Sequence, residues 1–211
     1  MVLQDRAKAT REAIIAGAAA VFEEHGYGNA SLTQVSQAAK VTKGALYFHF
    51  QSKEDLARAV IEEQHRLVLA EGQAILAESR PALTTMILMC RAFGLKLIHE
   101  PVVRAGIRLT LEATAFGQPV RGPYEDWIEA MGHLAEQARE EKQIRSSVTA
   151  AAFARYLVAS FTGVQMVSGI LTDRRDVMQR IEEMWSILLP GIMHEDYHED
   201  PMALAALISA K

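Results

Sequence analysis

Residues 31–56 read SLTQVSQAAKVTKGALYFHFQSKEDL and contain the most informative spacing in the chain. Ser31 and Thr42 stand where helix N-caps belong, so we expect two short helices over residues 32–39 and 43–50. A tight turn at Lys40-Val41 separates them. Two short helices joined in this way have the proportions of a helix-turn-helix, although spacing alone does not distinguish that motif from an ordinary helical hairpin.

The apolar residues of this stretch place one side of each short helix against a core. They are Leu32, Val35, Ala39, Val41, Leu46 and Phe50. The opposite side of the second helix would expose Thr42, Lys43, Gly44, Tyr47 and His49. In a helix-turn-helix the second helix enters the major groove, where Lys43 can reach a base edge and Gly44 permits close backbone approach. Tyr47 and His49 suit phosphate contacts that fix the register on DNA.

The rest of the chain also has helical periodicity, and we find no alternating strand pattern. A first helix is expected from about Asp5 to His25, ended by Gly26, and Ser52 is expected to cap a long helix that reaches Ala77. Further helices are expected over residues 81–100, 102–113, 149–170 and 175–193, around Trp127, and after Pro201. The fold class predicted from this pattern is all-α.

Charge is distributed unevenly along the chain. The net charge is −4, but residues 1–53 contain six basic and four acidic residues, which leaves +2 on this part and −6 on the remainder. Such asymmetry permits a basic face on an N-terminal module.

Cysteine content and hydropathy indicate the cellular compartment in which the protein is expected. The one cysteine, Cys90, excludes an intrachain disulfide, and its apolar neighbours predict a buried thiol. No run reaches the roughly 18 consecutive apolar residues of a transmembrane helix, and no signal-peptide pattern follows Gln4. We therefore expect a soluble cytoplasmic protein without a membrane partner.

The stretch from Ser31 to Leu56, together with the upstream Phe22 and Gly26-Tyr27, closely resembles the N-terminal signature of the TetR family of repressors. The resemblance implies an all-α homodimer of about nine or ten helices per chain, bound to pseudo-palindromic operator DNA. Phe48 is left out of the expected DNA contacts, with packing of its side chain within the fold as the open alternative. Carried over position by position, the resemblance implies DNA contacts from Arg6, Arg11, Thr33, Thr42, Lys43, Gly44, Tyr47, His49 and Lys53.

Other segments resemble the γ-butyrolactone receptor branch of this family, notably residues 41–50 and 100–109, Trp127, and Glu183-Met184-Trp185. The resemblance implies release from DNA by a small lactone or butenolide signal, in the control of secondary metabolism. A polar ring with an aliphatic tail calls for a mostly apolar pocket with a few hydrogen-bonding groups. The expected pocket residues are Gln64, Val68, Phe93, Trp127, Val158 and Thr162. The alternatives are that Trp127 is ordinary core and that Thr162 bonds only its own backbone.

The sequence thus predicts a DNA-binding domain over residues 1–53 and a ligand-binding and dimerisation domain over residues 54–211. Small residues in the helix 149–170 predict close helix approach in a four-helix dimer interface, with burial inside one subunit as the alternative. These residues are Ala150, Ala151, Ala154, Ala159 and Gly163. A regulator of this family that answers an antibiotic or another lipophilic compound, such as a pseudo-receptor or an efflux regulator, is the alternative to a hormone receptor.

An enzyme is the main rival class, because residues 194–198 read HEDYH and match the zinc-protease pattern H-E-x-x-H. Such a site needs a supporting helix and a third ligand. Here the motif follows Pro190-Gly191 within an acidic run, and no ligand follows Asp200, so we expect a solvated turn. No cofactor, metal or enzymatic activity is expected. A helical interaction protein without DNA affinity would leave the exposed Lys43, Tyr47 and His49 unexplained.

Overall fold

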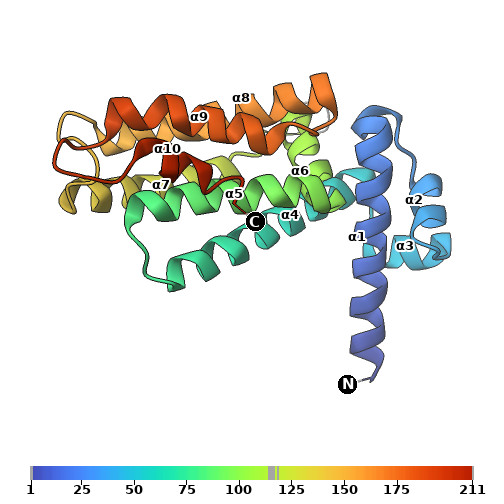
Figure 1. The fold of residues 1–211 in the computed structure, drawn as a ribbon. Coiled ribbons are helices and arrows are strands. Elements are labelled where there is room, and N and C mark those ends of the chain that lie inside the picture. The colour runs from blue at the N-terminus through green and yellow to red at the C-terminus, as the bar shows by residue number, and fades with distance from the viewer. Residues whose placement is uncertain (1, 114–116, 118, 211) are drawn as a thin grey trace. The chain divides into compact units, whose positions relative to one another are not determined.

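A computed structural model describes residues 2–113, 117 and 119–210. These residues form α-helices joined by loops, with one isolated antiparallel bridge between Ile144 and Met193, which confirms the all-α prediction (Figure 1). The helices of the described chain are α1 (Val2–Asn29), α2 (Leu32–Ala38), α3 (Lys43–His49), α4 (Lys53–Ala77), α5 (Ala82–His99), α6 (Pro101–Leu111), α7 (Gly122–Glu140), α8 (Ala150–Thr172), α9 (Val177–Ile192) and α10 (Pro201–Ala206).

The chain divides into two compact units. The N-terminal unit comprises Met1–Leu69 and His99–Val120, and the C-terminal unit comprises Ala70–Ile98 and Arg121–Lys211. By compactness, α6 therefore belongs with α1–α3, although it lies between α5 and α7 in the sequence. The expected division into DNA-binding residues 1–53 and ligand-binding residues 54–211 concerns function and stays a prediction.

The core of the N-terminal unit is formed by α1 and the helices that pack on it. Ile14, Ala18 and Phe22 of α1 are fully buried, and Leu46 of α3 and Leu56 of α4 pack in the same cluster. Gly26 interrupts α1 with φ 72° and ψ 172°, a left-handed conformation that glycine adopts without steric cost. The predicted helix end at Gly26 is thus confirmed as a break, although helical residues resume after it up to Asn29.

In the C-terminal unit, α7 packs against α8, α8 against α9, and α10 against α9. Trp185 of α9 is its largest fully buried side chain, and Leu83 and Met86 of α5 are also fully buried. Cys90 is buried on α5, as predicted, and burial raises the pKa of its thiol to about 12. The thiol is therefore not a reactive nucleophile at neutral pH.

Asp176 ties the turn between α8 and α9 together. Its Oδ1 accepts hydrogen bonds from the hydroxyls of Ser168 and Thr172, both at 2.6 Å, and its Oδ2 accepts one from Arg180 Nε at 2.8 Å. These hydrogen bonds to the charged form, led by those of the two hydroxyls, lower the pKa of Asp176 to about 2. The carboxylate thus holds a turn whose Asp173 has a left-handed φ of 52°.

We expect Asp176→Asn to lower the melting temperature at neutral pH, because the amide keeps a hydroxyl acceptor but loses the ion pair with Arg180. Since the pKa is depressed on folding, the carboxylate stabilises the fold above its ordinary value of 3.8 and loses this effect as the pH falls towards about 2. Calorimetry of both proteins across this range should show their difference shrinking below about pH 4. Glu140→Gln, at an exposed carboxylate, is the control. If the loss of melting temperature in Asp176→Asn did not change with pH, or were no larger than the loss in Glu140→Gln, the stabilising role of the Asp176 carboxylate would be contradicted.

Candidate DNA-binding surface and ligand pocket

The two short helices of the N-terminal unit begin at the residues that the sequence indicates. Ser31 Oγ accepts a hydrogen bond from Gln34 N at 3.2 Å, and Gln34 Oε1 accepts one from Ser31 N at 2.9 Å, which completes a capping box on α2. Thr42 Oγ1 accepts from Ala45 N at 3.1 Å and caps α3. Lys40 makes the turn between them with a left-handed φ of 54°.

The outer face of α3 is open to solvent. Leu46 and Phe50 are buried beneath it, whereas Thr42, Lys43 and Gly44 are exposed and Tyr47 is 51% exposed. A Cβ placed on Gly44 would meet only Thr42 Oγ1, at 3.9 Å. No packing within the described chain therefore demands glycine at this position, and the absent side chain leaves room for an external partner. His49, expected to be exposed, is only half-exposed.

Phe48, whose role the sequence leaves open between DNA contact and packing, is exposed on this surface. It does not pack against the fold: its side chain is 77% exposed, and its ring meets only the edge of the His49 ring, at a centroid distance of 5.2 Å. The packing alternative does not hold, because α3 is two turns long and its core side is filled by Leu46 and Phe50. The sequence-based set of DNA contacts therefore omits the most exposed aromatic side chain of this surface.

The other expected DNA contacts lie on α1, α2 and α4. Arg6, Arg11 and Thr33 are exposed, and the Arg11 guanidinium lies 5.4 Å from the centroid of the Phe50 ring. Lys53 Nζ donates to the carbonyls of Tyr27 at 2.7 Å, Ala30 at 3.0 Å and Gly28 at 3.3 Å. Lys53 is thus engaged within the chain, and its expected phosphate contact stays a prediction.

Three aromatic rings meet in the C-terminal unit where the ligand pocket is expected. The Phe93 ring of α5 lies 5.4 Å from the Trp127 ring of α7 and 5.1 Å from the Phe161 ring of α8, measured between centroids. The Trp127 indole Nε1 is buried and has no hydrogen-bond partner among the described residues. The structure therefore brings together two predicted pocket residues and adds Phe161, which the sequence assigns to the apolar face of its helix.

Thr162 and Val158 lie on the same helix, α8. Thr162 Oγ1 donates to Val158 O at 2.8 Å, as expected for the alternative in which this threonine bonds its own backbone. A hydrogen bond also links the hydroxyls of Thr162 and Tyr124, and burial raises the pKa of Tyr124 against the effect of that bond. Tyr124 is absent from the predicted pocket residues, although it lies three residues before Trp127 and so on the same face of α7.

Gln64 and Val68, the other two predicted pocket residues, belong to the N-terminal unit. Both are buried on α4, and Gln64 Oε1 has no hydrogen-bond partner in the described chain. A Cβ on Gly106 of α6 would lie 2.4 Å from Gln64 Cβ, so α4 and α6 approach closely at this point. The prediction that Gln64 and Val68 share one pocket with Phe93, Trp127, Val158 and Thr162 stays a prediction.

The H-E-x-x-H segment has none of the supports of a zinc site. Residues 194–198 form a turn and coil after α9, where Asp196 N donates to His194 Nδ1 at 3.1 Å. Within residues 2–113, 117 and 119–210, no group of three or more His, Cys, Asp or Glu side chains is arranged to hold a metal ion. The helical geometry that this motif requires is therefore missing.

Two family models match the chain. "Bacterial regulatory proteins, tetR family" covers residues 14–60, and "Tetracyclin repressor-like, C-terminal domain" covers residues 80–194, more than half of the sequence. The chain belongs to the TetR family. Members of this family are transcriptional regulators and not enzymes, so the helix-turn-helix of α2 and α3 is a DNA-binding motif in a TetR-type repressor.

Similar proteins include the A-factor receptor protein of Streptomyces griseus, 38% identical over 92% of this chain and 67% of the receptor. A solved structure of a γ-butyrolactone receptor, an ArpA-like protein, is 30% identical over 96% of this chain and 98% of its own, with a TM-score of 0.82. CprB of Streptomyces coelicolor, solved with its biological operator sequence, is 30% identical over 98% and 99% of the two chains, with a TM-score of 0.84. This chain is thus related to γ-butyrolactone receptors over most of its length.

Two helices of the described chain, α5 and α8, are long and apolar enough to cross a membrane by length and composition alone. Half of the α5 segment and a third of the α8 segment are buried inside the structure. Arg91 and Lys96 interrupt the apolar run of α5, and Arg155 interrupts that of α8. Core helices of soluble proteins pass the same test, and the family to which this chain belongs consists of soluble transcription regulators.

Proposed function

We propose that this protein is a cytoplasmic repressor that binds pseudo-palindromic operator DNA as a homodimer and is released by a γ-butyrolactone or butenolide signal. The observation that carries the ligand assignment is the buried indole N–H of Trp127, which has no acceptor although it lies within an aromatic cluster. A buried donor without a partner costs about 1–3 kcal/mol, and a ligand carbonyl would remove that cost. The similarity to γ-butyrolactone receptors supports a lactone as the source of this carbonyl.

The aromatic cluster suits a small ring with an aliphatic tail. Phe93 and Phe161 offer apolar faces, while Trp127 supplies a hydrogen-bond donor, which is the composition typical of small-molecule pockets. Tyr124 in the first turn of α7 and Thr162 in the middle of α8 offer neighbouring hydroxyls for a polar group on the tail. Gln64 Oε1, an acceptor without a partner, suits a ligand hydroxyl.

DNA binding would use the exposed face of α3. Lys43 and Gly44 lie in the first turn of α3 and would meet base edges, while Tyr47 and His49 would contact phosphates. Phe48 joins this set, since an exposed aromatic side chain can contact a thymine methyl group. Arg6, Arg11, Thr33 and Lys53 complete the proposed contacts with the backbone that flanks the groove.

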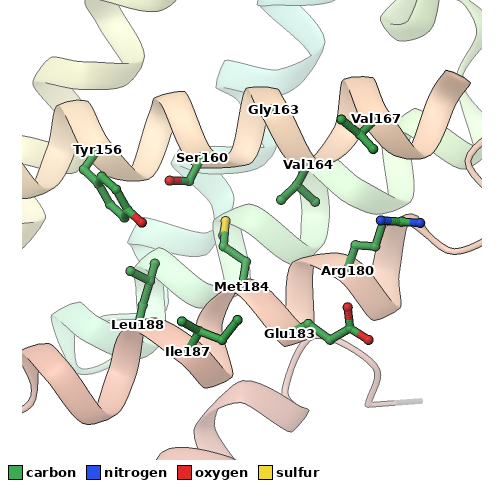
Figure 2. Close-up of a pocket in the computed structure, with 10 residues that line it drawn as sticks. All are labelled: Tyr156, Ser160, Gly163, Val164, Val167, Arg180, Glu183, Met184, Ile187 and Leu188. Atoms are coloured by element: carbon green, nitrogen blue, oxygen red, sulfur yellow. The ribbon is translucent and has the colours of Figure 1, made fainter. Parts of the chain in front are cut away.

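Dimerisation would use the outer faces of α8 and α9. A groove of about 460 Å³ lies between these helices, with Val164 and Val167 on one side and Met184, Ile187 and Leu188 on the other (Figure 2). Ala150 and Ala154 are buried within the single chain, so burial rather than dimer contact explains these two small residues. Ala151, Ala159 and Gly163 remain accessible, as expected of an interface that needs close helix approach.

The experiment that tests the proposed function is a titration of the protein–operator complex with synthetic γ-butyrolactones bearing aliphatic tails, with butenolides, and with antibiotics and their biosynthetic intermediates. Release by micromolar lactone or butenolide supports the proposal. Release only by an antibiotic or an intermediate would instead assign the chain to the pseudo-receptors or efflux regulators. A lack of salt-sensitive, sequence-selective DNA binding would overturn the repressor model itself.

Trp127→Phe is expected to keep operator binding and raise the lactone concentration for half-release roughly tenfold or more, because the phenyl ring keeps the stacking but lacks the N–H donor. Trp127→Ala should lose release altogether, since it also removes the ring that packs on Phe93. Fluorescence anisotropy of labelled operator measures both the operator affinity and the lactone concentration for half-release. Trp185→Phe makes the same exchange at the buried tryptophan of α9 and should leave the half-release concentration unchanged. Equal release from Trp127→Phe and wild-type protein would exclude the indole as a ligand donor.

A further inference from the structure

A second pocket lies in the C-terminal unit, where α4 and α7 end and α5 begins. Its volume is about 520 Å³, within the range of roughly 300–1,000 Å³ that is typical of small-molecule sites. Leu134 of α7, on its wall, lies seven residues beyond Trp127, which is about 10 Å along a helix, and the buried Met131 stands between them. This pocket shares no lining residue with the aromatic cluster or with the groove between α8 and α9.

The Glu141 carboxylate is held in a fixed position on one side of this pocket. Its Oε1 accepts a hydrogen bond from Gln137 Nε2 at 2.7 Å, and its Oε2 accepts one from Gln143 Nε2 at 2.6 Å. Gln143 is only 5% exposed, and its Oε1 accepts the backbone N–H of Leu83, in the first turn of α5, at 2.8 Å. Two neutral amides thus orient Glu141 without neutralising it, and no cation of the described chain forms an ion pair with it.

The charges around Glu141 favour a cationic group. Tyr197 lies in the acidic segment after α9, and its pKa is raised by burial and by the charges of Glu199 and Glu141. The charge of Glu141 therefore acts on its surroundings, and that of Glu199 has the same sign. An ammonium group against Glu141 would supply the opposite charge that the described chain does not provide.

Arg80 brings a positive charge to the same pocket. It lies in the connection between α4 and α5, next to Ser79, whose left-handed φ of 51° turns the chain. Its Nε and Nη2 bind Glu78, while Nη1 has no partner among the residues that the structure describes. Arg80 and Glu141 line one pocket but form no ion pair, so their charged atoms lie more than 4.0 Å apart. This separation leaves room for a ligand that carries both charges.

The remaining wall of the pocket includes apolar side chains. Leu76 at the end of α4 is 45% exposed, and Leu134 faces the pocket from α7. Pro81 lies beside Arg80 and adds to this surface. A carboxylate, a guanidinium and an apolar wall together match a molecule that has an ammonium, a carboxylate and an apolar side chain. An apolar amino acid has this composition.

We propose that this pocket binds a zwitterionic amino acid with an apolar side chain. Its ammonium would bind Glu141, its carboxylate would bind Arg80, and its side chain would pack on Leu76 and Leu134. The inference goes beyond the proposed function and does not depend on it, because the site and the ligand are both distinct from those proposed for the lactone. It gives the C-terminal unit a second small-molecule site.

The test is isothermal titration calorimetry of the full-length protein with L-phenylalanine, L-leucine and L-methionine. Two analogues separate the charged contacts: phenethylamine keeps the ammonium but lacks the carboxylate, and 3-phenylpropionate keeps the carboxylate but lacks the ammonium. Arg80→Gln and Glu141→Gln remove the two charges of the site, and circular dichroism verifies their fold. The matched controls are Arg139→Gln, at an arginine that pairs with Glu136, and Glu140→Gln, at an exposed carboxylate.

We expect at least one of the three amino acids to bind with a Kd of about 1 mM or lower. Removing either charge, from the protein or from phenylalanine, should weaken binding roughly tenfold or more, while both control variants bind as the wild type does. Arg80→Gln should leave the affinity for phenethylamine unchanged, because that ligand has no carboxylate for Arg80 to bind.

Three results would overturn the inference. The first is that none of the three amino acids binds at concentrations up to about 10 mM. The second is that folded Arg80→Gln and Glu141→Gln bind within about twofold of the wild type, which would place any binding elsewhere in the protein. The third is that either analogue binds wild-type protein as tightly as phenylalanine does. This third comparison needs no variant, so it decides the question even if Glu141→Gln does not fold.

Discussion

Replacing Gly17 with alanine is expected to destabilise the N-terminal unit by about 1–3 kcal/mol and to weaken operator binding roughly tenfold or more. A Cβ at this position would lie 2.7 Å from Ala39 N, 2.8 Å from Ala39 Cβ and 2.9 Å from Ala39 Cα. Two of these three atoms belong to the backbone, so no rotation of a side chain relieves the overlap. The clash outweighs the gain of about 1 kcal/mol that alanine brings to a helix interior.

The loss of operator affinity follows from the place of Ala39 in the motif. Ala39 ends α2 and immediately precedes Lys40, whose left-handed φ makes the turn into α3. Separating α1 from Ala39 therefore shifts the turn that aims α3 at the major groove. Each base contact that is lost costs about 1–3 kcal/mol of binding free energy.

Gly28→Ala is the matched control, because a Cβ there would meet nothing within 4 Å. Thermal unfolding and operator titration of both variants check the prediction. Gly28→Ala should match the wild type in both assays. Wild-type operator affinity in Gly17→Ala would show that the contact between α1 and Ala39 does not set the position of α3.

Local signals in the sequence were sufficient to place the two short helices, although not to distinguish a helix-turn-helix from a helical hairpin. Ser31 and Thr42 are confirmed as N-caps, since their hydroxyls satisfy backbone N–H groups within three residues along the chain. Gly26 is confirmed as the break in α1, because a left-handed residue is a local requirement that glycine meets. Interactions of such short range are encoded by neighbouring residues and can be inferred from one sequence.

Contacts between distant residues could not be inferred in the same way. Arg108 and its partner Glu23 are separated by 85 residues, and no spacing rule connects them. The meeting of Phe93 with Trp127 and Phe161 likewise depends on how three helices pack. Phe48 has an apolar aromatic side chain of the kind found in protein cores. It nevertheless lies on the surface, because no neighbouring helix covers it. Aromatic residues are buried or exposed according to such packing, which periodicity along a two-turn helix does not determine.

The proposed dimer gives the second large effect: Ile187→Glu is expected to yield a folded monomer whose operator affinity is lower by roughly a hundredfold or more. Ile187 lies on α9, lines the groove shown in Figure 2, and is 78% exposed, so its replacement by glutamate disturbs little within the single chain. In a two-fold interface the same residue is buried in both subunits, and an uncompensated carboxylate would be desolvated twice.

Operator affinity falls because two linked reading heads bind a pseudo-palindrome far more tightly than one head does. Sedimentation velocity and operator titration measure the two effects, and circular dichroism verifies the fold. Met202→Glu, at an exposed apolar residue of α10, introduces the same charge elsewhere on the C-terminal unit and should stay dimeric. If Ile187→Glu remained a dimer with wild-type affinity, the interface would lie outside the groove between α8 and α9, and the exposed apolar residues there would need another partner.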